Sequence, residues 1–189
     1  MRARMMVPLA MALALLCSTM IVAQDKAGPM TTKVPTNTAR ASILTTAKND
    51  SVMALFVKHV NKAGLGSTLD AKGPYTVFAP TNSGFNARTK EDIDAEHADT
   101  AVLNSTMRYH ILSGKALTTS DLMNMNGQML TMDNGMQLPV MVQGQVIRVG
   151  TATLSGSDIL ATNGVIHEVD HVLIPGKEMP MGTPVPMGK

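Results

Sequence analysis

The spacing of hydrophobic residues changes along the chain, and this change predicts where helices and strands lie. Between Met53 and Val60, apolar residues recur at positions i, i+3, i+4 and i+7, which is the pattern of an amphipathic helix. Asp50 or Ser51 can cap the start of this helix, and Gly64 can end it. We therefore expect a helix between Ser51 and Gly64.

Two further elements are predicted between residues 73 and 107. Gly73 and Pro74 interrupt the chain and are followed by a short extended run, Tyr75–Ala79, which Pro80 ends. A second helix is expected over Asp99–Met107, capped by Asp99 or Thr100, and it leads into Tyr109–Leu112. The predicted helices therefore come before most of the predicted strands.

The second half has short apolar runs separated by turn residues, which favours antiparallel strands. The expected strands are Met129–Met132, Met136–Val142, Gln145–Val149, Ser157–Ala161 and Val165–Ile174. The turns between them are Asp133-Asn134-Gly135, Gln143-Gly144 and Thr162-Asn163-Gly164, and the first is a strong hairpin signal. Helices early and antiparallel strands late predict an α+β domain.

The N-terminus has the pattern of a secretory signal peptide over residues 1–23. Arg2 and Arg4 supply a basic start, the almost wholly apolar run Met5–Leu16 follows, and Ala23 provides a small residue for cleavage. We therefore expect the protein to be exported, either to the periplasm or to the extracellular space.

Retention of this segment as a membrane anchor is the alternative. Met5 to Ala23 is a stretch of 19 uncharged residues, within the range of about 17–25 that a spanning helix needs. If the segment is not cleaved, it is the part of the chain expected to contact a membrane.

Composition divides the remainder into a domain with a tail at each end. Residues 24–39 are polar and show no apolar period, so they are expected to form a flexible linker. Residues 40–175 are expected to form one domain, and residues 176–189 a tail rich in Pro, Gly and Met.

Charge and cysteine content exclude several classes of function. Loss of Arg2 and Arg4 with the signal peptide reduces the 16 Lys and Arg to 14, which equals the 14 Asp and Glu. A neutral chain gives no electrostatic reason to expect nucleic-acid binding. The single cysteine, Cys17, lies within the signal peptide, so we expect no disulfides in the mature protein.

The segment His167-Glu168-Val169-Asp170-His171 matches the H-E-x-x-H pattern of zinc metalloproteases. That chemistry needs a helix, in which residues i and i+4 lie about 6 Å apart along the axis. In a strand the two histidines would be about 13 Å apart, too far for one zinc ion. The β-branched residues around the motif favour a strand, so a zinc hydrolase remains an alternative function and not the expected one.

Three segments together resemble the fasciclin (FAS1) domain family. Thr76–Phe85 (TVFAPTNSGF) resembles the first signature block, Tyr109-His110 the central pair, and Asn163–Pro175 (NGVIHEVDHVLIP) the second block. The resemblance covers roughly residues 41–175. It implies a wedge-shaped β-sandwich with a cluster of small helices, and a non-enzymatic role in adhesion or extracellular binding, without a cofactor.

The resemblance also implies roles for individual residues. Tyr109, His110 and the pair Asp158-Ile159 fall at positions that the family implicates in adhesion. The partner would be a cell-surface or extracellular-matrix protein or a glycan. Structural roles are expected for the signature residues Thr76, Phe78, Pro80, Thr81, Phe85, Asn163, Gly164 and His167.

Methionine is unusually frequent, with 17 residues in the chain. Most of them occupy positions where an apolar residue is expected, because Met is a flexible filler of cores. Met179, Met181 and Met187 in the tail have no core to fill, and thioethers are soft ligands for Cu(I). Copper handling by an exported Met-rich protein is therefore a further alternative function.

Overall fold

The computed structural model describes residues 41–177, and its helices and strands lie between Ile43 and Val169. The helices are α1 Ile43–Lys48, α2 Ala54–Lys62, α3 Gly66–Asp70, α4 Asn82–Asn86, α5 Lys90–Ala98, α6 Thr100–Arg108 and α7 Thr119–Met123, with a 3-10 turn at Ser51–Met53. The strands are β1 Tyr75–Pro80, β2 Ile111–Ser113, β3 Met129–Thr131, β4 Gln137–Gln143, β5 Val146–Val149, β6 Ala152–Ala161 and β7 Gly164–Val169. This is the α+β class predicted from the sequence.

Most of these short helices begin at a side chain that caps them. The hydroxyls of Ser42, Thr81, Thr89 and Thr118 each accept a backbone N–H from the first turn of the helix that follows. Asp99 does the same for α6 through its carboxylate. Because a helix of five or six residues has few internal hydrogen bonds, a side-chain cap supplies a large part of its local stability.

The seven strands form one strongly curled sheet in the order β2-β1-β7-β6-β5-β4-β3. All neighbouring pairs are antiparallel except β1 and β7, which run parallel and place Tyr75 opposite Gly164. The two ends of the sheet approach each other, since the backbone N–H of Asp133 donates to the carbonyl of Ile111 in β2 at 2.8 Å. The sheet is therefore nearly barrel-shaped.

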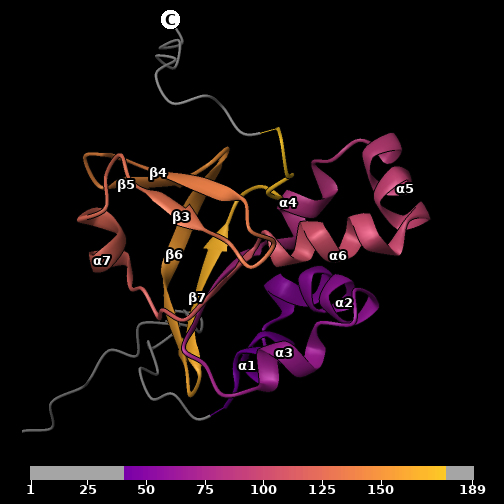
Figure 1. The fold of residues 1–189 in the computed structure, drawn as a ribbon, viewed down its shortest axis with the longest axis horizontal. Coiled ribbons are helices and arrows are strands. Elements are labelled where there is room, and N and C mark those ends of the chain that lie inside the picture. The colour runs from indigo at the N-terminus through magenta and orange to yellow at the C-terminus, as the bar shows by residue number, and fades with distance from the viewer. Residues whose placement is uncertain (1–40, 178–189) are drawn as a thin grey trace, which may run out of the picture. The chain divides into compact units, whose positions relative to one another are not determined.

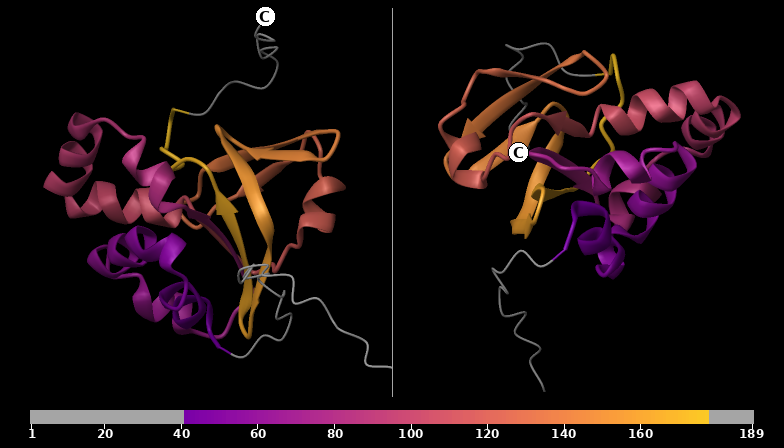
Figure 2. Two further views of the ribbon diagram at one scale, coloured as in Figure 1. Left: turned by 180° about the vertical axis from the view of Figure 1, so that it is seen from behind. Right: turned by 60° about the horizontal axis from the view of Figure 1, so that its bottom comes forward.

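Two hydrophobic cores follow from this curvature. The inner core lies inside the curled sheet and takes buried side chains from all seven strands, among them Phe78, Leu130, Val140 and Val149. The outer core lies between the sheet and α1, α2, α3, α4 and α6, with Phe56 and Phe85 among its larger members. Figure 1 shows α1–α6 gathered on one side of the sheet and α7 on the opposite side, and the two views of Figure 2 agree.

The predicted helices and hairpins are confirmed, with shifts at their ends. The hairpin around Gly135 is formed by β3 and β4, and Asp99 caps α6 as expected. The turn between β4 and β5 is centred on Gly144 and Gln145, one residue later than predicted, since Gln143 pairs with Val146. Five short helices, α1, α3, α4, α5 and α7, lack a long enough apolar period and were not predicted.

The last strand is shorter than the prediction of Val165–Ile174, because β7 ends at Val169. The backbone N–H of Leu173 donates to the Nε2 atom of His110 and not to a neighbouring strand. Val172 and Leu173 are buried nevertheless. Their apolar character therefore reflects burial in an irregular segment, which an apolar run alone cannot distinguish from a strand.

Candidate functional site

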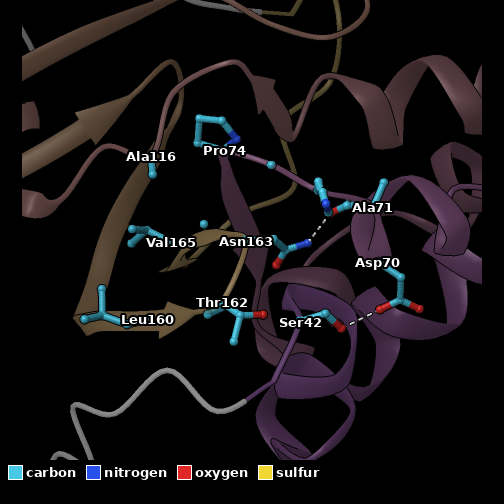
Figure 3. Close-up of a pocket in the computed structure, with 13 residues that line it drawn as sticks. Ser42, Asp70, Ala71, Pro74, Ala116, Leu160, Thr162, Asn163 and Val165 are labelled. Carbon is cyan, nitrogen blue, oxygen red and sulfur yellow. Dashed lines mark hydrogen bonds between the residues drawn. The ribbon is translucent and has the colours of Figure 1, made fainter.

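An open hollow of about 620 Å³ lies where the β6–β7 turn meets the connection between α3 and β1. Figure 3 shows Leu160, Val165 and Ala116 along one side and Asp70 on the other, with Ser42 and Thr162 at the base. The backbone at Ala71–Pro74 forms part of the wall. The hollow therefore combines an apolar side with polar groups, including the exposed Lys72 and the Ser42 hydroxyl that donates to Asp70.

Asn163 fastens the three segments around this hollow. Its side-chain oxygen accepts the backbone N–H of Ile43 at 2.8 Å, and its amide nitrogen donates to the carbonyls of Leu69 and Ala71, each at 2.8 Å. One side chain thus satisfies the first N–H of α1 and two carbonyls at the end of α3. The predicted structural role of Asn163 has a physical basis in these three bonds.

Gly164 is required because two backbones approach each other closely beside Asn163. A Cβ atom at Gly164 would lie 2.0 Å from the carbonyl oxygen of Tyr75, and one at Gly73 would lie 1.9 Å from the carbonyl oxygen of Asn163. Both distances are far below van der Waals contact, so neither position can carry a side chain without displacing the strands. The wall of the hollow is therefore backbone packed on backbone.

Asp158 lies in an irregularity of β6, two residues before Leu160 in the chain. The pairing of β6 with β7 shifts between Ser155 and Ile159, so that extra residues of β6 oppose His167. The carboxylate of Asp158 accepts the backbone N–H of Thr119 at 2.9 Å and also the Thr119 hydroxyl. Asp158 therefore links the start of α7 to the sheet. The irregularity in β6 accounts for this, because a bulge changes the direction in which a side chain points.

His167 lies between this carboxylate and a backbone carbonyl. Its Nε2 is 2.9 Å from the Leu117 carbonyl oxygen, its Nδ1 is 3.3 Å from Oδ1 of Asp158, and its ring stacks on Phe78. Burial lowers the pKa of His167, while the Leu117 carbonyl and Asp158 act in the opposite direction. The contacts give His167 a structural role, linking β7 to the segment before α7.

The H-E-x-x-H segment does not form a metal site among the described residues. His167 lies in β7, where its ring contacts the groups described above, and His171 follows the strand, with an exposed ring that contacts Asp170. Within residues 41–177, no group of three or more His, Cys, Asp or Glu side chains is placed to hold a metal ion. The strand interpretation of this motif is confirmed for His167.

Tyr109 and His110 both lie in the interior of the domain. Each is fully buried, and the Tyr109 hydroxyl donates to the carbonyl of Gln137 at 3.0 Å. The Nδ1 of His110 faces the Thr106 carbonyl at 2.8 Å, and its Nε2 accepts the N–H of Leu173 at 2.9 Å. These partners require the neutral imidazole, and burial accordingly lowers the pKa of His110 to about 4. Direct contact between either side chain and a partner would require the domain to open.

The other signature residues have structural contacts. Thr76 is fully buried, and its hydroxyl donates to the Lys115 carbonyl and accepts the N–H of Leu117. Thr81 caps α4 after Pro80 ends β1. Phe78 belongs to the inner core, and Phe85 to the outer core, where His59 stacks on its ring.

Several predictions fall outside the described residues. They concern the signal peptide or anchor, the linker, and the proposed soft-metal ligands Met179, Met181 and Met187. Among the helices in residues 41–177, none has the length and apolar character needed to cross a bilayer. Ile159, by contrast, is described and half-buried, and it packs against the outer core.

Sequence reasoning missed the polar residues of the hollow, namely Ser42, Asp70, Lys72 and Thr162. Gly73-Pro74 and the turn at Asn163 were each predicted to be loops, but nothing in the sequence indicated that the two loops lie side by side. The parallel pairing of β1 with β7 places the starts of both strands side by side. Such pairing between residues about 90 positions apart leaves no local pattern.

Comparison with known proteins gives one consistent result. The model of the fasciclin domain matches residues 51–175. The chain is 32% identical over 138 residues to protein sll1483 of Synechocystis, covering 71% of this chain and 73% of that protein. It is 29% identical to the transforming growth factor-beta-induced protein ig-h3 of Sus scrofa, covering 74% of this chain but only 20% of that much longer relative.

A solved structure has the same fold. It is a FAS1 domain pair from the insect cell adhesion molecule fasciclin I, with a TM-score of 0.59 and 20% sequence identity. The match covers 72% of this chain and 51% of that one.

Proposed function

The chain belongs to the fasciclin family of adhesion-type extracellular domains, and from this we propose that it is an exported, non-enzymatic binding domain that attaches to a cell-surface or extracellular-matrix protein or glycan. We further propose that the hollow between the β6–β7 turn and the α3–β1 connection is the binding surface. The observation that carries this is its combination of rigid backbone walls with exposed polar and apolar groups.

Rigidity supports the choice of this surface. The walls are fixed by the close approach of Gly164 to Tyr75 and by the three hydrogen bonds of Asn163. A preformed surface loses little conformational entropy on binding, so more of the contact energy appears as affinity. The buried pair Tyr109 and His110 offers no comparable accessible surface.

The chemistry of the hollow supports a macromolecular partner. The half-buried Leu160 and the exposed Ala116 provide apolar contact, while Lys72, Asp70 and Thr162 provide charges and a hydroxyl at the rim. An apolar centre with a polar rim is the usual composition of a protein-binding surface, and hydroxyl and carboxylate groups also suit sugar hydroxyls. Asp158 and Ile159 immediately precede Leu160, so the hollow is continuous with that family position in the chain.

Binding of the fluorescently labelled chain to cells of its own host tests this function. We expect saturable binding that Thr162→Arg, which fills the hollow with a longer side chain, weakens at least about tenfold. Lys58→Glu, an exposed change on α2 outside the hollow, is the matched control. Wild-type binding by Thr162→Arg would overturn the assignment of the surface, and absence of saturable binding would overturn the function.

A further inference from the structure

Methionine supplies all the sulfur in the part of the protein that the structure describes. The single cysteine, Cys17, lies outside residues 41–177. A thioether reacts with two-electron oxidants such as peroxides to give a sulfoxide, which is polar where the thioether was apolar. The effect of oxidation on the protein therefore depends on where each sulfur lies. The methionines in this range are Met53, Met107, Met123, Met125, Met129, Met132, Met136 and Met141.

Three of these side chains, which we call the surface methionines, are exposed. Met123 at the end of α7 is 40% exposed, Met129 at the start of β3 is 42% exposed, and Met136 just before β4 is 39% exposed. Peroxide in the solvent can reach their sulfur atoms without any movement of the domain. The other exposed large apolar side chains among the described residues are Val52, Val102 and Val146.

Three other methionines, which we call the core methionines, belong to the two hydrophobic cores. Met53 and Met107 are fully buried in the outer core, and Met132 in the inner core is 2% exposed. A sulfoxide at any of these positions would place a polar oxygen among apolar side chains. Burial of a polar group without a hydrogen-bond partner is destabilising, so oxidation of the core methionines would weaken the fold.

The geometry of the β3–β4 hairpin explains why two of its methionines are exposed. Leu130 and Leu138 lie opposite each other and belong to the inner core, so Met129, next to Leu130 in the strand, points away from that core. Met136 lies in the turn, where its carbonyl accepts the N–H of Met132 at 2.8 Å. Core filling, the usual role of methionine, therefore does not account for Met129 and Met136.

The surface methionines are also separate from the hollow. Among the described residues that line the hollow, none is a methionine. Figure 1 shows α7, β3 and β4 in a part of the domain away from α1 and α3. The function of these methionines can therefore be tested without changing the proposed binding surface.

Exposure determines both the order and the consequence of oxidation. A surface methionine reacts in the folded state, and water solvates the sulfoxide that forms, so no polar group becomes buried. A core methionine reacts only when the domain opens around it, and opened states are rare for the core of a stable domain. Oxidant is therefore consumed first where it does no damage.

From this distribution we propose that Met123, Met129 and Met136 are oxidant-consuming sites, which react with peroxide before the core methionines do and become sulfoxides without loss of the fold. The thioether sulfur attacks one oxygen of hydrogen peroxide, the O–O bond breaks, and that oxygen stays on the sulfur. The sulfur is oxidised by two electrons, and the other oxygen takes both protons and leaves as water. Each surface methionine thereby removes one molecule of peroxide that would otherwise reach a core sulfur.

Oxidation of the full chain with hydrogen peroxide tests the order of reaction. Peptide mass spectrometry measures the oxidised fraction of each methionine against time. We expect Met123, Met129 and Met136 to react at least about tenfold faster than the core methionines. While the core methionines remain reduced, the urea midpoint should stay unchanged. Similar rates in the two groups, or a lower midpoint before the core methionines react, would overturn the proposal.

A triple variant tests whether the surface methionines protect the core. The combined changes Met123→Leu, Met129→Leu and Met136→Leu keep the side chains apolar but remove three thioethers. With peroxide limiting, we expect the core methionines of this variant to be oxidised at least about 1.5-fold more than those of the wild type. The matched control changes three exposed valines and no sulfur, and should behave as the wild type does: Val52→Leu, Val102→Leu and Val146→Leu.

Equal oxidation of the core methionines in both triple variants would overturn the protective role. If the methionine variant does not fold, the relative oxidation rates in the wild-type chain decide the proposal, since they require no substitution.

Discussion

The β6–β7 turn and helix α5 are joined to the same domain by opposite means. At the turn, backbone packs on backbone at Gly164 and Gly73, and Asn163 makes three hydrogen bonds to distant segments. Helix α5 relies on an incompletely bonded ion pair and a histidine contact. The comparison shows that tight backbone packing can fix a signature segment while a helix elsewhere in the same domain is attached through polar side chains.

The largest effect is expected at Gly164. A Cβ atom would lie 2.0 Å from the Tyr75 carbonyl oxygen, so Gly164→Ala must separate β7 from β1. We expect the free energy of unfolding to fall by about 4 kcal/mol or more, measured by urea denaturation. Gly144→Ala is the control: unlike Gly164 it has a positive φ, 63°, but the space around it is open. Equal losses in both variants would show that backbone packing at the turn is unimportant.

Asn163→Ala is expected to have the next largest effect. It removes three hydrogen bonds and leaves the N–H of Ile43 and the carbonyls of Leu69 and Ala71 without this partner. A loss of about 3 kcal/mol in the free energy of unfolding follows, at about 1 kcal/mol per bond. Asn124→Ala, which removes one bond from an exposed residue, should change stability by less than about 1 kcal/mol. Similar losses at both positions would argue against the fastening role of Asn163.

Acid is expected to lower the free energy of unfolding of the domain through protonation of His110. Its pKa is lowered to about 4 in the folded state by burial, so the unfolded chain binds the proton more readily. Stability from this group is complete above about pH 6.5 and is lost as the pH falls to about 4, by about 3 kcal/mol in all. Urea midpoints measured across this range check the prediction. His110→Gln should flatten the dependence, and an unchanged slope in that variant would assign it to other groups.

The smallest effect on global stability is expected at α5. Glu96→Gln removes the charge that pairs with Arg88, but the cost is limited by the free energy needed to release α5 alone. We expect the free energy of unfolding to change by less than about 1 kcal/mol, while hydrogen exchange shows loss of α5 protection. A large decrease in the free energy of unfolding would mean that α5 unfolds together with the rest of the domain.

The elements with a local sequence pattern were predicted, and the structure shows why the other elements were not. The helix after Ser51 has an apolar period, and the hairpin at Gly135 has a turn motif, so both were found. Helix α5 has neither an apolar face nor a partner that its sequence specifies, and its contact with His59 joins residues 38 positions apart.

The candidate site was only partly predictable for the same reason. Asn163 and Gly164 were recognised as signature positions, but the sequence did not reveal that they form the wall of a hollow. Ser42 and Lys72 reach that hollow through the parallel pairing of β1 with β7 and through the bond from Ile43 to Asn163. Tyr109 and His110 were linked to binding only through the family resemblance, and their complete burial follows from tertiary packing that no local pattern reports.

The most direct test of the central claim is to measure stability and cell binding together for Lys72→Glu. Lys72 is exposed at the rim of the hollow, so the reversal of its charge should leave the free energy of unfolding within about 0.5 kcal/mol of the wild type. We expect binding to host cells to weaken severalfold with unchanged stability, while Lys58→Glu on α2 binds as the wild type does. Equal binding by Lys72→Glu and the wild type, or equal weakening by both charge reversals, would contradict the assignment of the hollow as the binding surface.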